Sequence, residues 1–280
     1  MKLKYNSKNR PRKIKKAFLL FGKIKNFFSL DLVLNEGGAE YNFSPKSKVE
    51  LFRYLTLFTK EEGTINWLKS TIKEGDVFVD IGANIGIYSV YAAKLANKVK
   101  VYSFEPHKPN FITLMDNIVR NGLHESISPI SIALGNSCDV IKLNYHSLVS
   151  GSSNSQLGHK RTAGEEGEFT PQFEEIVTSI TLDDLISKGA IVAPTVIKID
   201  VDGNEILILE GMEALLTSNN KPRSIQVELN VGEQDRIIEW MKVRNYTMQS
   251  KHYTSAGLVS LQKGVKEDQI AYNAIFAPSA

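Results

Sequence analysis

The chain has 280 residues, of which 42% are hydrophobic and 23% are charged. This balance is typical of a folded globular protein and excludes a disordered or membrane-spanning class. The single cysteine, Cys138, excludes an intrachain disulfide and a zinc site built from several cysteines, and it fits a reducing compartment such as the cytoplasm. The net charge of +3 is unevenly distributed, because ten of the 34 basic residues lie between Lys2 and Lys25, before the first acid, Asp31.

This asymmetry predicts a basic N-terminal arm over residues 1–45, followed by a catalytic domain over residues 46–280. The apolar stretch at residues 17–21 is much shorter than the ~20 residues of a membrane-spanning helix. As a helix, the arm would carry Phe18 and Phe21 on one face with lysines around it, a pattern typical of peripheral contact with anionic membranes. The hypotheses for residues 2–28 are therefore peripheral membrane contact from the cytoplasm, or a solvated tail that packs on its own domain.

After the arm, apolar periodicity predicts helices and strands that alternate along the chain. The predicted helices cover residues 51–72, 110–121, 205–216 and 235–244, with two more beginning near Ile87 and Thr181. The predicted strands cover residues 77–81, 99–104, 127–133, 195–199, 224–229, 246–252 and 269–276. The last two strands are expected to be joined without a helix, so that the final strand enters the sheet antiparallel. This order predicts an α/β fold with a mostly parallel sheet and helices on both faces.

One segment interrupts the alternation. Residues 147–173 are rich in Ser, Gly, Asn and Glu and show no apolar period. Such long irregular segments inside a compact domain are commonly functional lids or insertions. We therefore expect an irregular insertion or lid loop at the edge of the sheet or over the site.

The first predicted strand runs into a turn that contains glycines. Gly82 and Gly86 let the backbone approach a ligand closely, and the helix beginning near Ile87 offers unsatisfied N–H groups at its start. Asp80 is an acid within an otherwise apolar strand, and a buried carboxylate needs a compensating charge or hydrogen bond. A ligand that carries an ammonium group would supply one.

A second acid, Glu105, ends the next strand, 23 residues after Gly82. In a Rossmann unit an acid about 20 residues beyond the glycine turn accepts hydrogen bonds from ribose. A dinucleotide is disfavoured, because Asn84 occupies the second glycine position of the Gly-x-Gly-x-x-Gly turn and Asp80 would repel a pyrophosphate. A zwitterionic nucleoside such as S-adenosyl-L-methionine fits these residues better than NAD does.

The motifs at residues 80–86 (DIGANIG), 104–106 (FEP) and 197–203 (IKIDVDG) resemble those of the FkbM family of methyltransferases. The resemblance covers residues 76–229. It implies a class I methyltransferase Rossmann-like fold with a seven-stranded sheet, S-adenosyl-L-methionine as the cofactor, and methyl transfer that is usually onto oxygen. The chain departs from the family pattern at Asp202, where Glu is more frequent, and at Asn230, where His is common.

The resemblance also implies which residues bind the cofactor. The methionine part would lie on the turn, the ribose at Glu105, and the adenine beside Ala133 and Leu134. The full expected cofactor-binding set is Asp80, Gly82, Ala83, Asn84, Gly86, Tyr88, Glu105, Pro106, Ala133, Leu134 and Asp200.

Methyl transfer to a hydroxyl requires a group that accepts the hydroxyl proton. Asp200 and Asp202 follow the fourth major strand, Glu205 opens the next helix, and Glu228 ends the following strand. These four carboxylates are the predicted catalytic residues, with Asp200 the first choice, and crowding would raise their pKa values toward those of useful bases. Glu205 is equally well explained as an acid that favours a helix start.

Two further possibilities concern the same region. His146 and His159 border the irregular segment, so one of them is an alternative base. Asp200, Asp202 and a third oxygen ligand could hold Mg²⁺ or Ca²⁺, but two aspartates alone are not a coordination motif, and no metal is assigned.

The sequence thus predicts methylation of a hydroxyl on a sugar, glycolipid or other small polar metabolite, and it makes no prediction of the oligomeric state. One alternative is a nucleic-acid methyltransferase that uses the basic arm to bind phosphates. It is disfavoured because residues 200–203 read DVDG and offer no aromatic side chain to stack on a flipped base. The other alternative is a non-catalytic module that only binds the cofactor.

Overall fold

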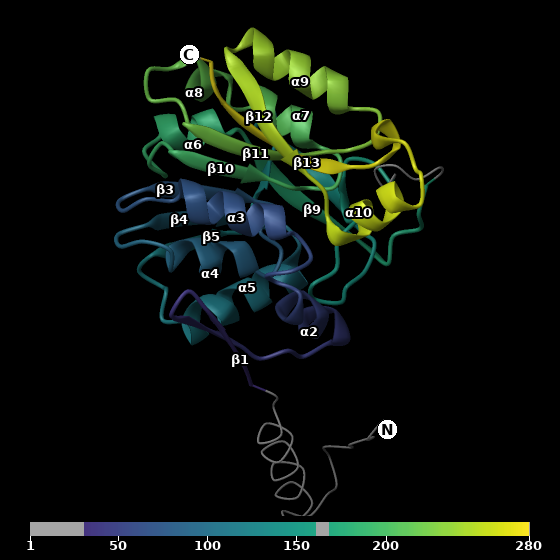
Figure 1. The fold of residues 1–280 in the computed structure, drawn as a ribbon. Helices are drawn as coiled ribbons and strands as arrows, with labels where there is room; N and C mark the ends of the chain where they lie inside the picture. Colours follow the sequence, from purple (N-terminus) through teal and green to yellow (C-terminus); the bar gives the residue numbers. More distant parts are fainter. Residues whose placement is uncertain (1–30, 161–167, 280) are drawn as a thin grey trace, which may run out of the picture.

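The computed structural model describes residues 31–160 and 168–279 of the chain. Within these ranges a seven-stranded sheet runs through the molecule in the order β12-β13-β11-β10-β3-β4-β5 (Figure 1). Its strands are β3 (Val77–Ile81), β4 (Lys100–Phe104), β5 (Ile127–Ile130), β10 (Val196–Ile199), β11 (Ser224–Leu229), β12 (Tyr246–His252) and β13 (Tyr272–Pro278). Only β13 runs antiparallel to its neighbours β11 and β12, so the predicted antiparallel last strand is confirmed.

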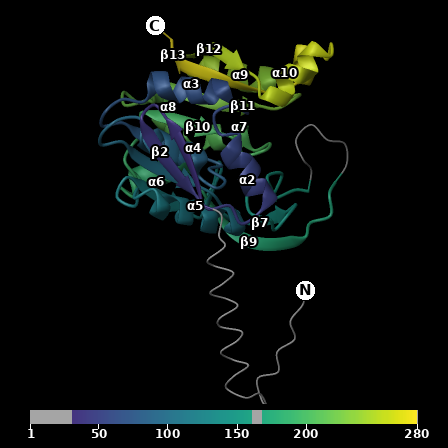
Figure 2. The same cartoon turned by 60° about the horizontal axis from the view of Figure 1, so that its bottom comes forward.

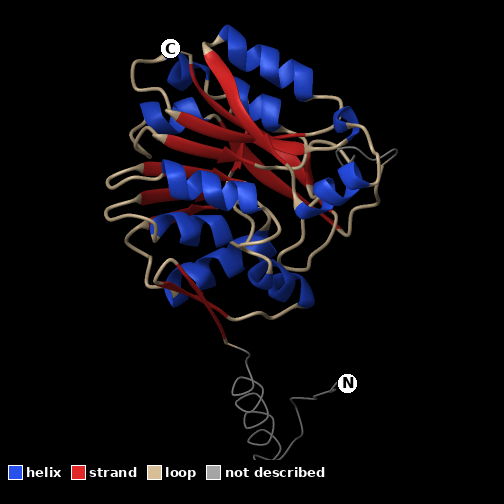
Figure 3. Cartoon of the chain, viewed as in Figure 1, coloured by secondary structure: helices blue, strands red, loops and turns tan. Residues whose placement is uncertain are grey.

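Helices cover both faces of this sheet, as predicted (Figure 3). One face carries α2 (Lys48–Leu55), α3 (Glu62–Thr71), α4 (Ile87–Ala93) and α5 (Lys108–Arg120), and the other carries α6 (Leu182–Ser187), α7 (Glu205–Glu210), α8 (Glu213–Thr217) and α9 (Gln234–Val243). Because side chains alternate along a strand, Phe78 packs in the first helical layer and Val79 in the second. Asp80 therefore points toward the same helical layer as Phe78, where Ser89 of α4 meets it.

Two predicted helices are each divided in the structure. The helix expected over residues 51–72 is α2 and α3, separated by a turn in which the hydroxyl of Thr56 donates to the carbonyl of Phe52. The helix expected over residues 205–216 is α7 and α8, because the Asp183 carboxylate accepts hydrogen bonds from Ala214 N and Leu215 N and so caps α8 as a separate helix.

A second sheet of four strands, in the order β6-β9-β7-β8, was not predicted. Its strands are β6 (Ala133–Leu134), β7 (Asp139–Tyr145), β8 (Gln156–Leu157) and β9 (Phe173–Ile180). The strand expected over residues 127–133 therefore ends at Ile130, and the chain crosses into the second sheet at Ala133. The described part of the segment 147–173 is irregular apart from β8 and the start of β9.

The connection between β12 and β13 contains the helix α10 (Ser255–Gln262) and a 3₁₀ turn (Glu267–Gln269), so the prediction of a connection without a helix was wrong. Thr254 caps α10 by accepting a hydrogen bond from Gly257 N. The backbone N–H of Ser255 donates to the carbonyl of Lys60 at 2.8 Å. This bond joins α10 to the turn between α2 and α3.

Residues assigned to the arm by the sequence include a folded hairpin. Strands β1 (Leu32–Glu36) and β2 (Ala39–Phe43) pair antiparallel and lie against the layer of α4 and α5 (Figure 2). Tyr41 and Phe43 are buried in that layer's core, where the Tyr41 ring packs on Tyr91. The folded part of the described chain thus begins before residue 46.

The basic segment, residues 2–28, lies outside the described residues, so its contact with a membrane stays a prediction. In the described ranges no helix is long and apolar enough to cross a membrane. Removing residues 2–25 is expected to weaken binding to anionic phospholipid vesicles in a sedimentation assay, because ten positive charges are lost. Affinity for S-adenosylhomocysteine is the control and should not change. Equal vesicle binding by both proteins would contradict the hypothesis.

Candidate active site

The turn after β3 is held against the ends of the two neighbouring strands. The N–H groups of Gly82 and Ala83 donate to the carbonyl of Phe104 at 3.0 and 2.9 Å. Gly82 has a positive φ of 76°, and a Cβ atom there would lie 1.9 Å from the carbonyl oxygen of Asp200. Only glycine therefore allows the turn and the end of β10 to approach this closely.

Replacing Gly82 with alanine is expected to destabilise the protein more than replacing Gly75. Both glycines have nearly the same positive φ, 76° and 78°, but a Cβ at Gly75 would meet no atom within 4 Å. Gly75→Ala should cost about 1–2 kcal/mol in the free energy of unfolding, which is the cost of the left-handed backbone alone. Gly82→Ala should cost more and should also displace Asp200. Urea unfolding measures both variants, and equal losses would show that the contact with Asp200 does not constrain the turn.

Glu105 follows β4 and is almost fully buried. One carboxylate oxygen accepts a hydrogen bond from Asn84 N at 2.7 Å, and the other accepts one from His107 N at 2.8 Å. Burial raises the pKa of Glu105 to about 7, although these two bonds oppose the shift. A carboxylate offers about four acceptor positions, so two remain for a ligand's hydroxyl groups.

Protonation of Glu105 removes its negative charge and turns one of its acceptor positions into a donor. We therefore expect affinity for S-adenosylhomocysteine to fall as the pH drops below about 7. The dissociation constant should rise by up to about tenfold for each pH unit below that pKa. Titration calorimetry between pH 5.5 and 8 measures this effect. Glu105→Gln should bind S-adenosylhomocysteine more weakly, and its affinity should not change with pH. Glu205→Gln is the control, because it removes another carboxyl group whose pKa is about 7, and its affinity should keep the pH dependence of the unmodified protein. A flat profile for the unmodified protein would refute the role of Glu105.

A cavity of about 670 Å³ opens beside Glu105 and is here named the Glu105 cavity. Most of its wall is apolar and comes from β4, the β5–β6 crossing, β7, β8 and α7, through Phe104, Ile132, Ala133, Leu134, Leu143, Leu157 and Ile208. Pro106, His107 and Asn110 complete the wall next to Glu105. An apolar wall beside Glu105 suits a flat base with an attached ribose, and Asp200 and Asp202 lie where this cavity meets the next one.

A second cavity, of about 610 Å³, lies on the other side of the turn and is here named the Glu228 cavity. Its wall is polar and highly charged, and it includes Arg53, Lys60, Glu61, Ala83, Ile87, Tyr88, Lys198, Glu228 and Thr254. The two cavities share Gly82, Asn84, Ser153, Asp200 and Asp202. A group passing from one cavity to the other would therefore pass beside the two aspartates.

Lys198 lies beneath this junction with only 1% of its side chain exposed. Its Nζ is 2.7 Å from the Asp200 carboxylate and 3.9 Å from that of Asp80, and it also faces the ring of Tyr88 at 5.1 Å. Burial opposes the charge on Lys198, yet the two aspartates hold its pKa above the usual value. Lys198 was not among the site residues expected from the sequence, although a lysine within the apolar strand 195–199 is a signal that could have identified it.

The four predicted catalytic carboxylates differ in their surroundings. Burial works against ionisation of Asp200, but Lys198 holds its pKa below the ordinary value. Burial and then the neighbouring charge of Asp200 raise the pKa of Asp202. Burial and the carboxylates of Asp200, Asp202, Glu205 and Glu61 raise the pKa of Glu228 well above its usual range. Asp200 is therefore ionised at neutral pH, so the expected rise of its pKa by crowding was wrong because Lys198 outweighs it, whereas the protonated form of Glu228 is favoured.

Glu205 is fully buried and lines neither cavity. Its carboxylate accepts hydrogen bonds from Val201 N, Gly203 N and Asn230 Nδ2. It thus holds the loop between β10 and α7, in agreement with the alternative reading of an acid at a helix start.

The segment 147–155 closes over the junction of the cavities. The carbonyl of Ser152 accepts hydrogen bonds from the side-chain amides of Asn84 and Asn110, at 2.8 and 3.0 Å. The N–H of Asn154 donates to the Asp202 carboxylate at 2.7 Å, and Asp202 has a positive φ of 60°. The predicted irregular loop is therefore bound to the glycine turn, to α5 and to the loop after β10.

The comparisons with known proteins agree with this geometry. Residues 80–248, more than half of the chain, match the family described as the methyltransferase FkbM domain. The chain belongs to the FkbM methyltransferase family. It is therefore a methyltransferase, as the motifs at residues 80–86 and 197–203 implied.

Two relatives and one solved structure illustrate the relationship of this FkbM methyltransferase to known proteins. The hexuronic acid methyltransferase AglP of Haloferax volcanii is 28% identical, over 72% of this chain and 75% of its own length. The 31-O-demethyl-FK506 methyltransferase FkbM of Streptomyces tacrolimicus is 30% identical, over 59% of this chain and 68% of its own length. A structure of an S-adenosylmethionine-dependent methyltransferase from Streptococcus mutans superposes with a TM-score of 0.52 and 13% identity. The superposition covers 88% of this chain and 55% of the Streptococcus mutans chain, so this chain spans about half of that protein's length. That likeness concerns the fold, and it agrees with the predicted class I methyltransferase architecture.

In this FkbM methyltransferase most of the predicted site residues come together around the two cavities. Those that line at least one cavity are Gly82, Ala83, Asn84, Tyr88, Glu105, Pro106, Ala133, Leu134, Asp200, Asp202 and Glu228. Asp80 and Gly86 line neither. Asp80 lies under the turn, with one carboxylate oxygen bound to the hydroxyl of Ser89 at 2.6 Å and the other without a hydrogen-bond donor among the described residues. Gly86 begins α4 in a left-handed conformation with a φ of 76°.

The structure also bears on the two histidines that were expected near the site and on a metal ion at Asp200 and Asp202. His146 and His159 are not among the residues that line the cavities. One oxygen of Asp200 accepts a hydrogen bond from Lys198, and one oxygen of Asp202 accepts one from Asn154 N. In the described ranges no three His, Cys, Asp or Glu side chains are grouped as ligands of a metal ion.

Proposed function

We propose that the protein is an S-adenosylmethionine-dependent O-methyltransferase that acts on a hydroxyl of a sugar, a glycolipid or another small polar metabolite. The observation that supports this most strongly is the pair of adjoining cavities that share Asp200 and Asp202, one mostly apolar beside Glu105 and the other polar beside Glu228. The two relatives are named for action on a hexuronic acid and on 31-O-demethyl-FK506, and these names support a polar, oxygen-containing acceptor.

The residues of the Glu105 cavity fit this cofactor. The two free acceptor positions of Glu105 suit the two ribose hydroxyls, and Ala133 and Leu134 offer an apolar surface for the adenine. The backbone of Gly82 and the side chain of Asn84 lie at the junction, where the methionine part would extend toward Asp200. When bound, S-adenosylmethionine supplies a methyl group on a positively charged sulfur.

The chain's own contribution is then orientation and proton transfer. The Glu228 cavity would hold the acceptor with its hydroxyl next to Asp200, whose ionised carboxylate accepts the proton as the oxygen becomes methylated. The raised pKa of Glu228 favours its protonated form, which can donate a hydrogen bond to the acceptor. Ser152 and Asn154 cover the junction and limit the access of water.

Titration calorimetry with S-adenosylhomocysteine, with NAD as the control ligand, tests the first part of the proposal. Micromolar binding of S-adenosylhomocysteine alone is expected, and binding of NAD alone would refute the cofactor. Methyl transfer from radiolabelled S-adenosylmethionine to a panel of sugars, glycolipids and RNA tests the second part. Transfer to RNA alone would favour the nucleic-acid alternative, and cofactor binding without any transfer would favour the non-catalytic module.

A further inference from the structure

We infer that the acceptor carries an anionic group, a carboxylate or a phosphate, which Arg53 and Lys60 bind at the wall of the Glu228 cavity. This inference rests on the proposed function, because it assigns a substrate class to the cavity proposed for the acceptor. Neither residue was selected from the sequence. Both lie before the first strand of the large sheet, on α2 and on the turn that follows it.

Arg53 has an unused pair of donor groups. Its Nε donates to the carbonyl of Gly151 at 2.5 Å, which fixes the side chain against the segment that closes the cavity. Among the described residues no acceptor pairs with the two terminal nitrogens of its half-buried guanidinium. A guanidinium presents its donors as a planar fork that matches the two oxygens of a carboxylate or phosphate. A neutral acceptor would offer this fork only uncharged oxygens, which form weaker hydrogen bonds with it.

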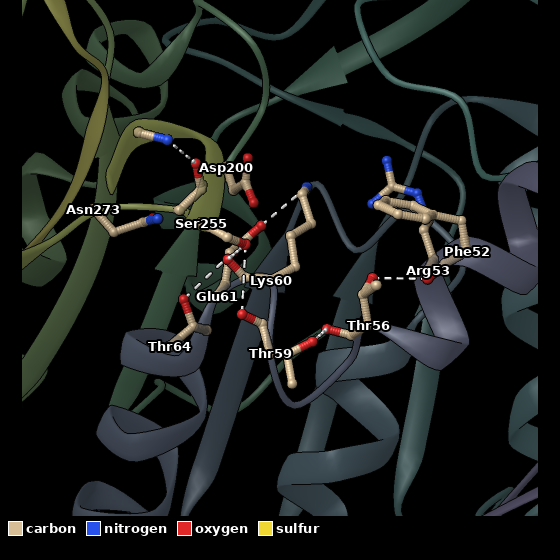
Figure 4. Close-up of polar contacts among 12 residues, drawn as sticks. Phe52, Arg53, Thr56, Thr59, Lys60, Glu61, Thr64, Asp200, Ser255 and Asn273 are labelled. Carbon is tan, nitrogen blue, oxygen red and sulfur yellow. Dashed lines mark hydrogen bonds and ion pairs between the residues drawn. The ribbon is translucent and has the colours of Figure 1, made fainter. Parts of the chain in front are cut away.

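Lys60 provides a second positive charge in the same cavity. Its Nζ lies 3.2 Å from the carboxylate of Glu61, so one of its three donors is used. Its backbone carbonyl accepts hydrogen bonds from the N–H and the hydroxyl of Ser255, which hold the turn in place. In Figure 4 the side chains of Arg53 and Lys60 extend toward the side on which Asp200 lies.

The ion pairs around the cavity distinguish Arg53 from the two lysines of its wall. Lys198 is paired with Asp200 and Asp80, and one donor of Lys60 is paired with Glu61. Burial and nearby carboxylates raise the pKa of Glu228 well above its usual range, which weakens the repulsion between this acid and an anion. The positive charge of Arg53 is therefore the one without a close partner among the described residues. An acceptor would place its anionic group at Arg53 and its hydroxyl at Asp200.

Three sugars that differ mainly at one carbon test this inference. Glucose, glucuronate and glucose 6-phosphate carry at C6 a hydroxymethyl group, a carboxylate and a phosphate. Inorganic phosphate is the minimal probe. Binding of each compound is measured by calorimetry with and without S-adenosylhomocysteine, so that the result does not depend on turnover. At least one anionic sugar should bind about tenfold more tightly than glucose, the effect of one added charge-assisted hydrogen-bonded pair. The stronger of the two identifies carboxylate or phosphate as the preferred group.

Arg53→Met should remove this preference, and Arg53→Lys, which keeps the charge without the fork, should retain part of it. Lys46→Met is the matched control, because Lys46 is exposed, pairs with Asp116 and lines neither cavity. Equal binding of glucose and both anions, a preference that survives Arg53→Met, or no binding of phosphate and either anionic sugar would each overturn the inference. Anion binding without methyl transfer to any acceptor would instead refute the proposed function and leave the anion site standing.

Discussion

Asp200→Asn is expected to reduce methyl transfer by about 10²–10⁴-fold, the usual contribution of a positioned proton acceptor. Asparagine keeps the shape of the side chain and can still accept the hydrogen bond from Lys198, but it cannot accept the hydroxyl proton. Affinity for S-adenosylhomocysteine should therefore change much less than the turnover rate. Single-turnover kinetics and calorimetry on the same preparation separate these two quantities.

Glu205→Gln is the matched control for this prediction. Asp200 follows β10 and Glu205 begins α7, but Glu205 lines neither cavity and holds the backbone of the loop between these two elements. Its substitution should affect stability more than the rate of the chemical step. If Asp200→Asn retained most of the turnover, or if the two variants lost turnover equally, Asp200 would not be the proton acceptor.

Lys198→Met is expected to lower the free energy of unfolding by about 3–5 kcal/mol, because it leaves two buried or half-buried carboxylates without their cation. Urea denaturation followed by circular dichroism measures the loss. Adding Asp80→Asn should restore part of the stability, since one of the unpaired charges is then removed. Lys60→Met is the comparison at a more exposed ion pair, where a loss of about 0–1 kcal/mol is expected.

The ion pairs of Lys198 with Asp80 and Asp200 also determine how the free energy of unfolding changes with pH. Lys198 holds the pKa of Asp200 below its ordinary value, so the stability from this pair is present above about pH 4 and is lost as the pH falls through the lowered pKa. The Lys198→Met variant should lack this acid-dependent loss. A variant as stable as the unmodified protein at every pH would show that the cluster contributes nothing to folding.

The site residues that could be predicted from the sequence are those that directly follow a strand of the large sheet. Glu105 and Asp200 could be located because the carboxyl ends of parallel strands meet at one edge of a sheet, and the order of strands followed from the periodicity. Lys198 was missed although it is a charged residue within an apolar strand, the same signal that identified Asp80. Only the structure shows that Asp80 and Asp200 surround it.

The residues of the acceptor wall could not be predicted in the same way. Arg53 and Lys60 belong to a region whose apolar spacing indicated one continuous helix, and nothing in that spacing places it beside Asp200. Thr254 comes from a connection that was expected to contain no helix. The strands β7 and β9 were missed because the exposed face of the small sheet carries apolar side chains such as Val140 and Ile176, which hide the alternation.

The hydrogen bonds between Ser255 and Lys60 join segments that are nearly 200 residues apart in the chain. Four of the nine residues found only in the Glu228 cavity, Arg53, Lys60, Glu61 and Thr254, come from these two segments, and none of the four lines the Glu105 cavity. Under the proposed function, substitution of these four residues would change acceptor selectivity without altering the wall of the nucleotide pocket. Such a division would let one ancestral scaffold diversify toward new acceptors by exchanging two short peripheral segments.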